Sequence, residues 1–312
     1  MGEEQTSRQR ALIFALLTHA IWGSLPLYLL LVQDVPPLEF VAWRTLFTVP
    51  VCLFFVVSSG KLGQLRQTLT DKRTMLILMA SACMIAINWL GYVWAIQNEY
   101  IYAASLGYYI LPLNMMLLGY VFLKERMNKV QAVAVALAVI AVGALAAGAL
   151  TTMWISLLLG TTFGVYGLLR KTVAAGPLIG LTTEAIILLP LVAGYLTWLG
   201  TTSEGLTLGR DAVESLAIIA GGLVTAIPLL LFATAARALP YTTIGFLQFI
   251  SPTAIFILGL TVFGEEMKPA QLVCFALIWA AIALFTWDLL HSANKARMAR
   301  RGAVLGRGVT PQ

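Results

Sequence analysis

Two stretches of this sequence read SLGYYILPLNMMLLGYVFLKERMNKVQ (residues 105–131) and GFLQFISPTAIFILGLTVFGEEMKPAQ (residues 245–271). At an offset of 140 residues they share an isoleucine, a proline, a leucine-glycine pair, a glutamate, a methionine and a glutamine in one ungapped register. The same offset pairs Pro50 with Pro190. Chance similarity between two apolar helices is common, but a register that also matches a glycine and a loop glutamate indicates an internal duplication.

The composition predicts that both copies lie in a membrane. The chain has 312 residues, of which 60% are hydrophobic and only 11% charged, whereas soluble domains carry about 25% charged residues. We therefore expect an all-α integral membrane protein and exclude the water-soluble classes. Its apolar runs of about 20 residues, the length that crosses a bilayer, predict ten transmembrane helices at 11–32, 38–58, 74–97, 102–123, 130–148, 152–169, 178–198, 212–236, 241–263 and 269–290.

The basic residues predict the orientation of these helices. Of the 20 Lys and Arg, 17 fall on one side of the predicted spans, and such a bias marks the cytoplasmic side, so both termini are expected there. Each copy holds five helices, an odd number, so the second copy enters the membrane from the opposite side. The equivalent loops agree, because KERMNK (124–129) is basic and GEEMKP (264–269) is acidic. We expect two inverted five-helix repeats, 11–148 and 152–290, and a basic cytoplasmic tail, 291–312.

Inverted repeats are typical of secondary transporters, in which the substrate site lies near the midplane between the halves. The basic residues sit in short loops and form no face that alternates with aromatic residues, so no nucleic-acid partner is expected. The sequence has no GxxxxGK[ST] motif, so no nucleotide partner is expected either. The three cysteines lack metal-ligand spacing, and we expect neither a metal nor a cofactor. The expected partners are the lipid bilayer, a small-molecule substrate and a coupling ion, for which a proton is the candidate.

Several short motifs resemble those of RarD-type permeases, in the EamA-domain branch of the drug/metabolite transporter superfamily. The motifs are IWGSLPLY (21–28), WRTLF (43–47), NWLGYVWAIQN (88–98), ASLGYYILPL (104–113), YGLLRK (166–171), TAIPLLLF (225–232) and FLQFISPT (246–253). The resemblance covers nearly the whole chain. It implies ten helices around a central cavity, a location in the bacterial inner membrane, and export as the more usual direction.

Ionisable residues deep in a span usually face a cavity or a partner. The residues that fit this description are Arg44, Glu184 and His19. Arg44 and Glu184 are related by the offset, and each lies about 9 Å inside its own helix start at 1.5 Å per residue, in opposite leaflets. Arg44 is a candidate clamp for a substrate carboxylate, and Glu184 a candidate proton-coupling site or cation contact. The alternative is a structural pair between their long side chains, or hydrogen-bonded anchors that hold the two halves together. His19 is a second coupling or gating candidate, or else a hydrogen-bond bridge.

Polar and aromatic residues near the middle of the spans are expected to line an amphipathic cavity. The candidate substrate-binding residues are Asn88, Trp89, Tyr108, Tyr109, Gln248, Trp22 and Tyr166, beside Arg44. The alternative is that the aromatic rings pack and the amides bridge helices. Prolines within spans create points for bending, and the candidate hinges are Pro26, Pro112, Pro228 and Pro252. Glu125 and Glu265 are expected to cap the helices that begin near residues 130 and 269.

The leading hypothesis is a secondary active transporter that exports a small amphipathic metabolite, an amino-acid-like or a drug-like compound by alternating access. An intramembrane enzyme is the main alternative, disfavoured because the spans contain no HExxH motif, no acidic pair and no Gly-x-Ser-x-Gly turn. A membrane receptor or scaffold without transport activity is the third class. The sequence does not distinguish ion coupling from substrate exchange.

Overall fold

The computed structural model describes residues 2–203, 205–262, 264 and 269–306, and in this part of the chain helices are joined by turns and loops, without a strand. Within it, ten helices are long and apolar enough to cross a membrane. Their bounds differ from the sequence prediction by a few residues at most, so the predicted fold class is confirmed. The cytoplasmic orientation of the termini stays a prediction.

The described residues form two compact units. Unit 1 comprises the described residues within 1–125 and 149–266, and unit 2 those within 126–148 and 267–312. Unit 1 contains α1 (Gly2–Leu29), η1 (Leu30–Val32), α2 (Pro37–Ser58), α3 (Leu62–Thr70), α4 (Lys72–Gln97), α5 (Ile101–Val121), α7 (Met153–Thr172), α8 (Pro177–Gly200), α9 (Ala212–Ala238), α10 (Tyr241–Gln248) and α11 (Ile250–Thr261). Unit 2 contains α6 (Lys129–Ala146) and α12 (Pro269–Gly306), and the 3-10 helix η2 (Ala147–Thr152) spans the boundary.

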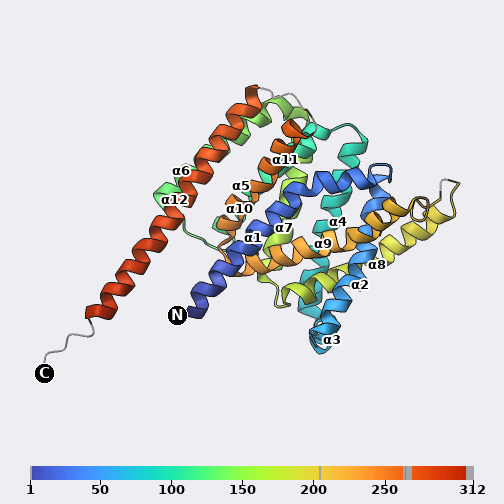
Figure 1. Ribbon diagram of the computed structural model, residues 1–312, viewed down its shortest axis with the longest axis horizontal. Helices are drawn as coiled ribbons and strands as arrows, with labels where there is room; N and C mark the ends of the chain where they lie inside the picture. The colour runs from blue at the N-terminus through green and yellow to red at the C-terminus, as the bar shows by residue number, and fades with distance from the viewer. Residues whose placement is uncertain (1, 204, 263, 265–268, 307–312) are drawn as a thin grey trace. The chain divides into compact units, whose positions relative to one another are not determined.

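Unit 2 pairs one helix from each half of the sequence, α6 with α12 (Figure 1). The buried carboxylate of Asp288 in α12 accepts hydrogen bonds from Asn128 Nδ2 at 2.8 and 2.9 Å and from Gln131 Nε2 at 2.9 Å. Asn128 and Gln131 also form the capping box that starts α6. The helix α12 continues to Gly306, so part of the predicted tail extends the last helix, while residues 307–312 lie outside the described residues. The predicted repeat bounds are not tested by this division.

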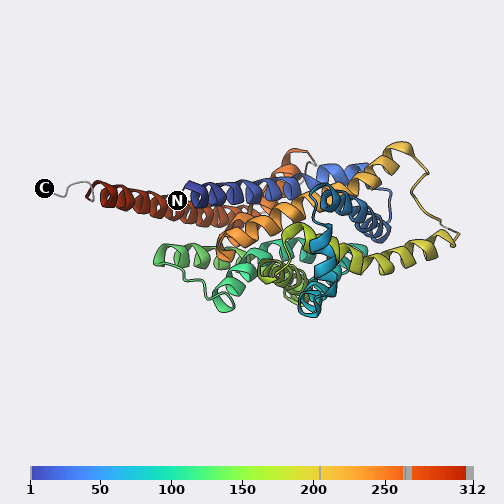
Figure 2. The ribbon, with the colours of Figure 1, turned by 90° about the horizontal axis from the view of Figure 1, so that it is seen from below.

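In unit 1 the packing of the helices follows the exchange of the two halves. The exchange maps α1 onto α7, α2 onto α8, α4 onto α9, and α5 onto α10 and α11. Accordingly α1 packs on α9 as α7 packs on α4, and α1 packs on α10 and α11 as α7 packs on α5. The helices α2 and α8 pack on each other, as do α5 and α10. This is the pattern that inverted repeats produce. Figures 1 and 2 show α8 and α9 joined by the yellow connection at the right.

Small residues let these helices approach closely. A Cβ atom on Gly160 in α7 would lie 3.2 Å from the backbone nitrogen of Leu111 in α5. A Cβ atom on Gly167, two turns further along α7, would collide with the Tyr241 hydroxyl of α10. Helix interfaces in membranes favour such positions because close backbones gain van der Waals contact. The sequence therefore places the thin face of α7 against α5 and α10.

Two of the candidate hinge prolines lie where a helix changes its form. The predicted span 241–263 is broken between Gln248 and Ile250, and Pro252 follows the break because it has no N–H to donate to the carbonyl of residue 248. Pro26 comes three residues before the end of α1, which continues as the 3-10 helix η1. Pro112 and Pro228 lie inside the uninterrupted helices α5 and α9. Bending at any of the four is not tested.

Glu125 caps a helix, but not the helix that the sequence predicted. The Glu125 carboxylate accepts the backbone N–H groups of Tyr241 at 2.5 Å and Thr242 at 2.8 Å, so it caps α10. The left-handed backbone at Lys124, with φ of 53°, turns the chain before Glu125, and Asn128 caps α6 instead. Glu265 lies outside the described residues.

The short helix α3 is also new, because the sequence prediction left residues 59–73 as a loop. Asp71 follows α3 and caps α4 by accepting the Thr74 backbone N–H at 3.1 Å. Hydrogen bonds from the Thr74 side chain and backbone lower the pKa of the Asp71 carboxyl below its usual value.

Candidate functional site

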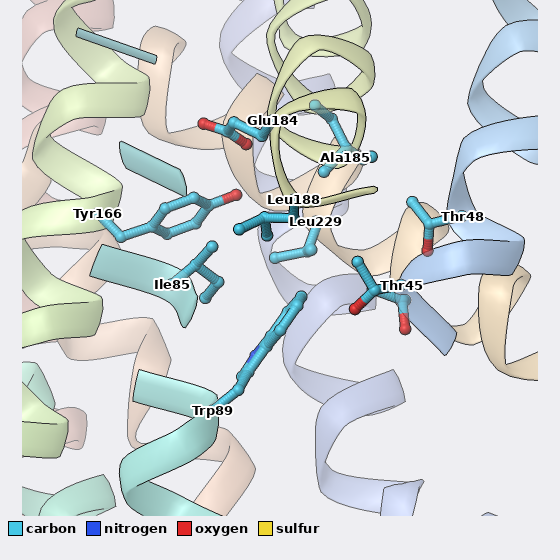
Figure 3. A pocket seen from close by; sticks show the side chains of 11 residues that line it. Thr45, Thr48, Ile85, Trp89, Tyr166, Glu184, Ala185, Leu188 and Leu229 are labelled. Carbon is cyan, nitrogen blue, oxygen red and sulfur yellow. The ribbon is translucent and has the colours of Figure 1, made fainter. Parts of the chain in front are cut away.

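A small pocket lies in unit 1, between helices of both halves of the sequence (Figure 3). Its volume is about 20 Å³, enough for one water molecule. It is lined by Thr45 and Thr48 of α2, Ile85 and Trp89 of α4, Tyr166 of α7, Leu181, Glu184, Ala185 and Leu188 of α8, and Thr225 and Leu229 of α9. Three predicted site residues therefore meet here: Trp89, Tyr166 and Glu184.

The lining follows the internal repeat. Four pairs of lining residues are related by the 140-residue offset, namely Thr45 with Ala185, Thr48 with Leu188, Ile85 with Thr225, and Trp89 with Leu229. A pocket lined by residues from equivalent positions of both halves lies on the pseudo-two-fold axis. Transporters with inverted repeats hold their substrate in such a position.

Glu184 is the acidic residue of the pocket, and its side chain is only 3% exposed. Its Oε1 accepts a hydrogen bond from Ser81 Oγ of α4 at 2.6 Å and lies 3.5 Å from Nη1 of Arg170. Its Oε2 has no hydrogen-bond partner. One carboxylate oxygen is thus held in place, and the other has unused hydrogen-bonding capacity.

Arg170 was placed in a cytoplasmic loop by the sequence analysis, and that placement is wrong. It belongs to the last turn of α7, and its side chain is 1% exposed. Nη2 donates to the Pro177 carbonyl at 2.7 Å, and the guanidinium lies against Gly180 so closely that a Cβ atom there would collide with it. The missing side chain at Gly180 is what lets Arg170 reach Glu184.

Tyr166 brings a hydroxyl group to the same pocket, and the phenol is completely buried. Figure 3 shows its hydroxyl pointing into the space that Glu184 and Trp89 also face. No hydrogen-bond partner lies within 3.5 Å of the hydroxyl, and it interacts with the Glu184 carboxylate at longer range. A buried polar atom with an incomplete partner is costly, so an additional polar group between these two side chains would be stabilised.

Arg44 does not pair with Glu184, so the structural alternative of a direct pair is wrong. Its Cζ instead lies 4.3 Å from the ring centroid of Trp89, a cation–π contact. Its Nε has no hydrogen-bond partner. The repeat explains the neighbours of both residues. Arg44 packs against Gly221 of α9, and Glu184 accepts a hydrogen bond from Ser81 of α4. Gly221 and Ser81 are related by the 140-residue offset, as Arg44 and Glu184 are.

The remaining candidates lie outside the lining of this pocket. Asn88 donates to the Leu159 carbonyl at 2.8 Å and to Thr162 Oγ1 at 3.0 Å, so its amide bridges α4 and α7. The ring of Trp22 packs with those of His19, Phe163 and Phe232.

The last four candidates differ in their burial. His19 is completely buried, with Nδ1 3.3 Å from Ser251 Oγ and no partner for Nε2. Gln248 is buried at the end of α10, and its Oε1 has no partner. In α5, Tyr109 is half-buried and Tyr108 is exposed.

A set of reciprocal hydrogen bonds joins α7 and α9 at the ends nearest Arg170, and we call it the α7–α9 latch. Lys171 Nζ donates to the carbonyls of Ala236 and Leu239 at 2.6 Å each. Arg237 Nη1 donates to the carbonyls of Val173 at 2.7 Å and Ala175 at 2.8 Å. Cations at helix C-termini also interact favourably with the helix dipoles.

The latch has no counterpart in the other half of the repeat. The offset relates Lys171 to Leu31 and Arg237 to Gln97, and neither of these side chains is a cation. The ends of α7 and α9 are therefore joined by cationic side chains, whereas the equivalent ends of α1 and α4 have no cation at these two positions.

Comparison with known proteins identifies the family. The profile of the EamA-like transporter family matches residues 9–147. An uncharacterized transporter of Pseudomonas aeruginosa, PA0485, is 39% identical over 293 residues, covering 92% of this chain and 96% of the relative. Protein RarD of Streptomyces exfoliatus is 34% identical, covering 94% and 93%. The chain belongs to the RarD-type branch of the EamA-like transporter family. A crystal structure of a protein at 16% identity superposes with a TM-score of 0.68, covering 89% of this chain and 97% of that one, which shows the shared fold.

As a RarD-type member of the drug/metabolite transporter superfamily, the chain is a multi-pass membrane protein and a transporter. The sequence analysis of this RarD-type chain missed Arg170 because it stands next to Lys171 in a basic pair at the end of a span. It also missed the threonines of α2. The repeat offset is a signal that could have led to more of the lining, since it relates Trp89 to Leu229 and Thr45 to Ala185.

Proposed function

We propose that this transporter is a secondary active carrier that moves a small amphipathic metabolite, an amino-acid-like or drug-like compound, by alternating access. The observation that carries the proposal is the pocket whose lining comes from equivalent positions of both halves. Exchange of the conformations of two inverted halves exposes such a pocket first to one side of the membrane and then to the other. The family membership supports export across the bacterial inner membrane as the direction.

The lining of the pocket is mostly apolar, with a few polar groups. Ile85, Leu188 and Leu229 provide the apolar surface, and the free oxygen of Glu184 with the Tyr166 hydroxyl provides hydrogen-bonding capacity. This chemistry favours an amphipathic compound over a simple ion. At about 20 Å³ the pocket has room for one water molecule, so binding of a substrate requires the helices that line it to separate.

Glu184 is the proposed proton-coupling residue. It faces the pocket, it has one unpaired oxygen, and its charge is balanced by Arg170 alone among the described residues. Protonation would remove its attraction to Arg170 and free the Ser81 hydroxyl as a partner for another group. Coupling requires that substrate and proton compete for, or share, this carboxylate.

The test uses the full chain in proteoliposomes with a panel of amphipathic metabolites, with and without a pH gradient. Flux of at least one compound that responds to the gradient supports the proposal. Glu184→Gln should keep exchange of that compound but lose its response to the gradient. A retained response in Glu184→Gln would overturn the coupling role. Crosslinks that fix either end of the pocket should stop flux, and continued flux in a crosslinked form overturns alternating access. If no compound is carried while ligands still bind, the chain acts as a receptor instead.

A further inference from the structure

The buried charges of unit 1 are not all held in ion pairs. Among the described residues the one ion pair is Arg170 with Glu184. The buried carboxylate of Glu39 in α2 instead accepts hydrogen bonds from Trp43 Nε1 at 2.9 Å and from the backbone N–H and the hydroxyl of Thr207 at 2.8 Å each. No described carboxylate lies within 4 Å of the Arg44 guanidinium, whose titratable neighbours are the phenols of Tyr28, Tyr92 and Tyr108. Arg44 is thus a cation that makes no ion pair within the described part of the chain.

An unpaired cation within a membrane span is unfavourable. A cation–π contact contributes about 0.5–2 kcal/mol, whereas an ionisable group near the middle of a bilayer costs about 2.5–3.5 kcal/mol or more. Trp89 therefore offsets only part of the cost of Arg44. The unpartnered Nε shows that hydrogen-bonding capacity is also unused. A group that fits this position is an anion that accepts hydrogen bonds from the guanidinium.

The surroundings of Arg44 indicate what kind of anion. Trp89 contacts the guanidinium and also lines the pocket, so an anion bound at Arg44 has the apolar pocket beside it. When the guanidinium turns toward an anion, it leaves the indole face, and that face becomes free for an apolar ring of the ligand. The phenols of Tyr92 and Tyr108 contact each other at 6.0 Å between ring centroids and form an aromatic border. Tyr108 is 39% exposed, so this border reaches the surface of the protein.

We propose that the substrate of the carrier is an organic anion with an aromatic or other flat apolar body, whose anionic group binds Arg44 and whose body packs on Trp89. This inference rests on the proposed function for its site and names the substrate class. The matched test compounds are phenylacetate, phenylacetamide and 2-phenylethylamine, which share a ring and differ in charge. Acetate and inorganic phosphate carry the charge without the ring.

Binding to the purified full chain in detergent is measured from the shift in thermal unfolding over a concentration series. Phenylacetate should stabilise the protein, while the amide, the amine and phosphate should not. Arg44→Gln should weaken phenylacetate binding about 10- to 100-fold, the loss expected for charge-assisted hydrogen bonds, and Arg44→Lys should weaken it less. Arg66→Gln, on the exposed face of α3, is the matched control and should bind as the wild type does.

The ring has its own test. Phenylacetate should bind the wild type at least about tenfold more tightly than acetate, and Trp89→Ala should abolish this preference, since burial of an aromatic ring contributes more than 1.4 kcal/mol. Absence of phenylacetate binding, equal binding of the amide, or unchanged binding in Arg44→Gln overturns the anion assignment. An unchanged preference in Trp89→Ala overturns the role of the indole. Binding is measured here without flux, so the two proposals can fail separately. If the proteoliposome assay shows transport of neutral or cationic compounds alone, this inference is overturned and the transporter proposal is not.

Discussion

Nη1 of Arg170 lies 3.5 Å from Oε1 of Glu184, and both side chains are almost completely buried. The two residues come from consecutive helices, α7 and α8, of the second half of the sequence. Ser81 of the first half donates the hydrogen bond that fixes the same carboxylate oxygen. The pair therefore connects the pocket lining to the contact between the two halves, and a change in either charge is expected to affect both.

The first prediction concerns the energetic dependence of the two charges on each other. Arg170→Met and Glu184→Met should each lower the free energy of unfolding by about 3–5 kcal/mol, because each leaves a buried charge without its partner. The double variant should cost much less than the sum of the two, because neither charge remains. The measurement is a double-mutant cycle of unfolding in detergent. Additive losses would show that the pair is not coupled.

The second prediction concerns Gly180. Gly180→Ala should lower stability by about 1–3 kcal/mol, because a Cβ atom there collides with the Arg170 guanidinium. Gly194→Ala is the matched control in the same helix, since nothing lies within 4 Å of a Cβ atom at that position. The control should be neutral or slightly stabilising, as alanine is the better helix former. Equal thermal unfolding temperatures of the two variants would contradict the role of Gly180.

The third prediction concerns the α7–α9 latch. Lys171→Met and Arg237→Met each remove two charge-assisted hydrogen bonds, and the ends of α7 and α9 should then separate more often. The reporter is Cys52, which is completely buried, in a background with Cys83→Ser and Cys274→Ser.

Maleimide should label Cys52 at least about tenfold faster in either latch variant than in the reporter background, since one charge-assisted hydrogen bond contributes about 1.5–3 kcal/mol and 1.4 kcal/mol corresponds to a factor of ten. Lys61→Met, at an exposed position before α3, is the control and should leave the rate unchanged. Unchanged labelling in both latch variants would show that these bonds do not hold the two helices together.

The fourth prediction concerns Glu125. Glu125→Ala should cost about 0.5–2 kcal/mol, the usual effect of losing a helix cap, because the N–H groups of Tyr241 and Thr242 lose their acceptor. Hydrogen exchange should speed up at these two amides and leave the start of α6 unchanged, since Asn128 caps that helix. Faster exchange at the start of α6 alone would instead support the cap predicted from the sequence.

The types of residue at the site could largely be predicted from the sequence, but the contacts that each residue makes could not. Glu184 was chosen as an ionisable residue deep in a span, and Trp89 and Tyr166 as aromatic residues that could line a cavity, and the three do line one pocket. Asn88 and Trp22 met the same criterion, yet their amide and ring contact helices and neighbouring rings outside that lining. A residue type shows that a partner is needed, but it does not distinguish a cavity from a neighbouring helix.

The sequence by itself determined the ten helices, their approximate ends and the internal repeat. The helices depend on local hydropathy, and the repeat is visible as matching residues at an offset of 140 positions. Only the tertiary structure decided which charges meet. Arg170 enters the protein because Gly180, ten residues later on another helix, leaves room for it, and Glu184 pairs with Arg170 and not with Arg44. Contacts of this kind depend on side-chain directions and on the space between packed helices, and neither is encoded in the hydropathy of a single span.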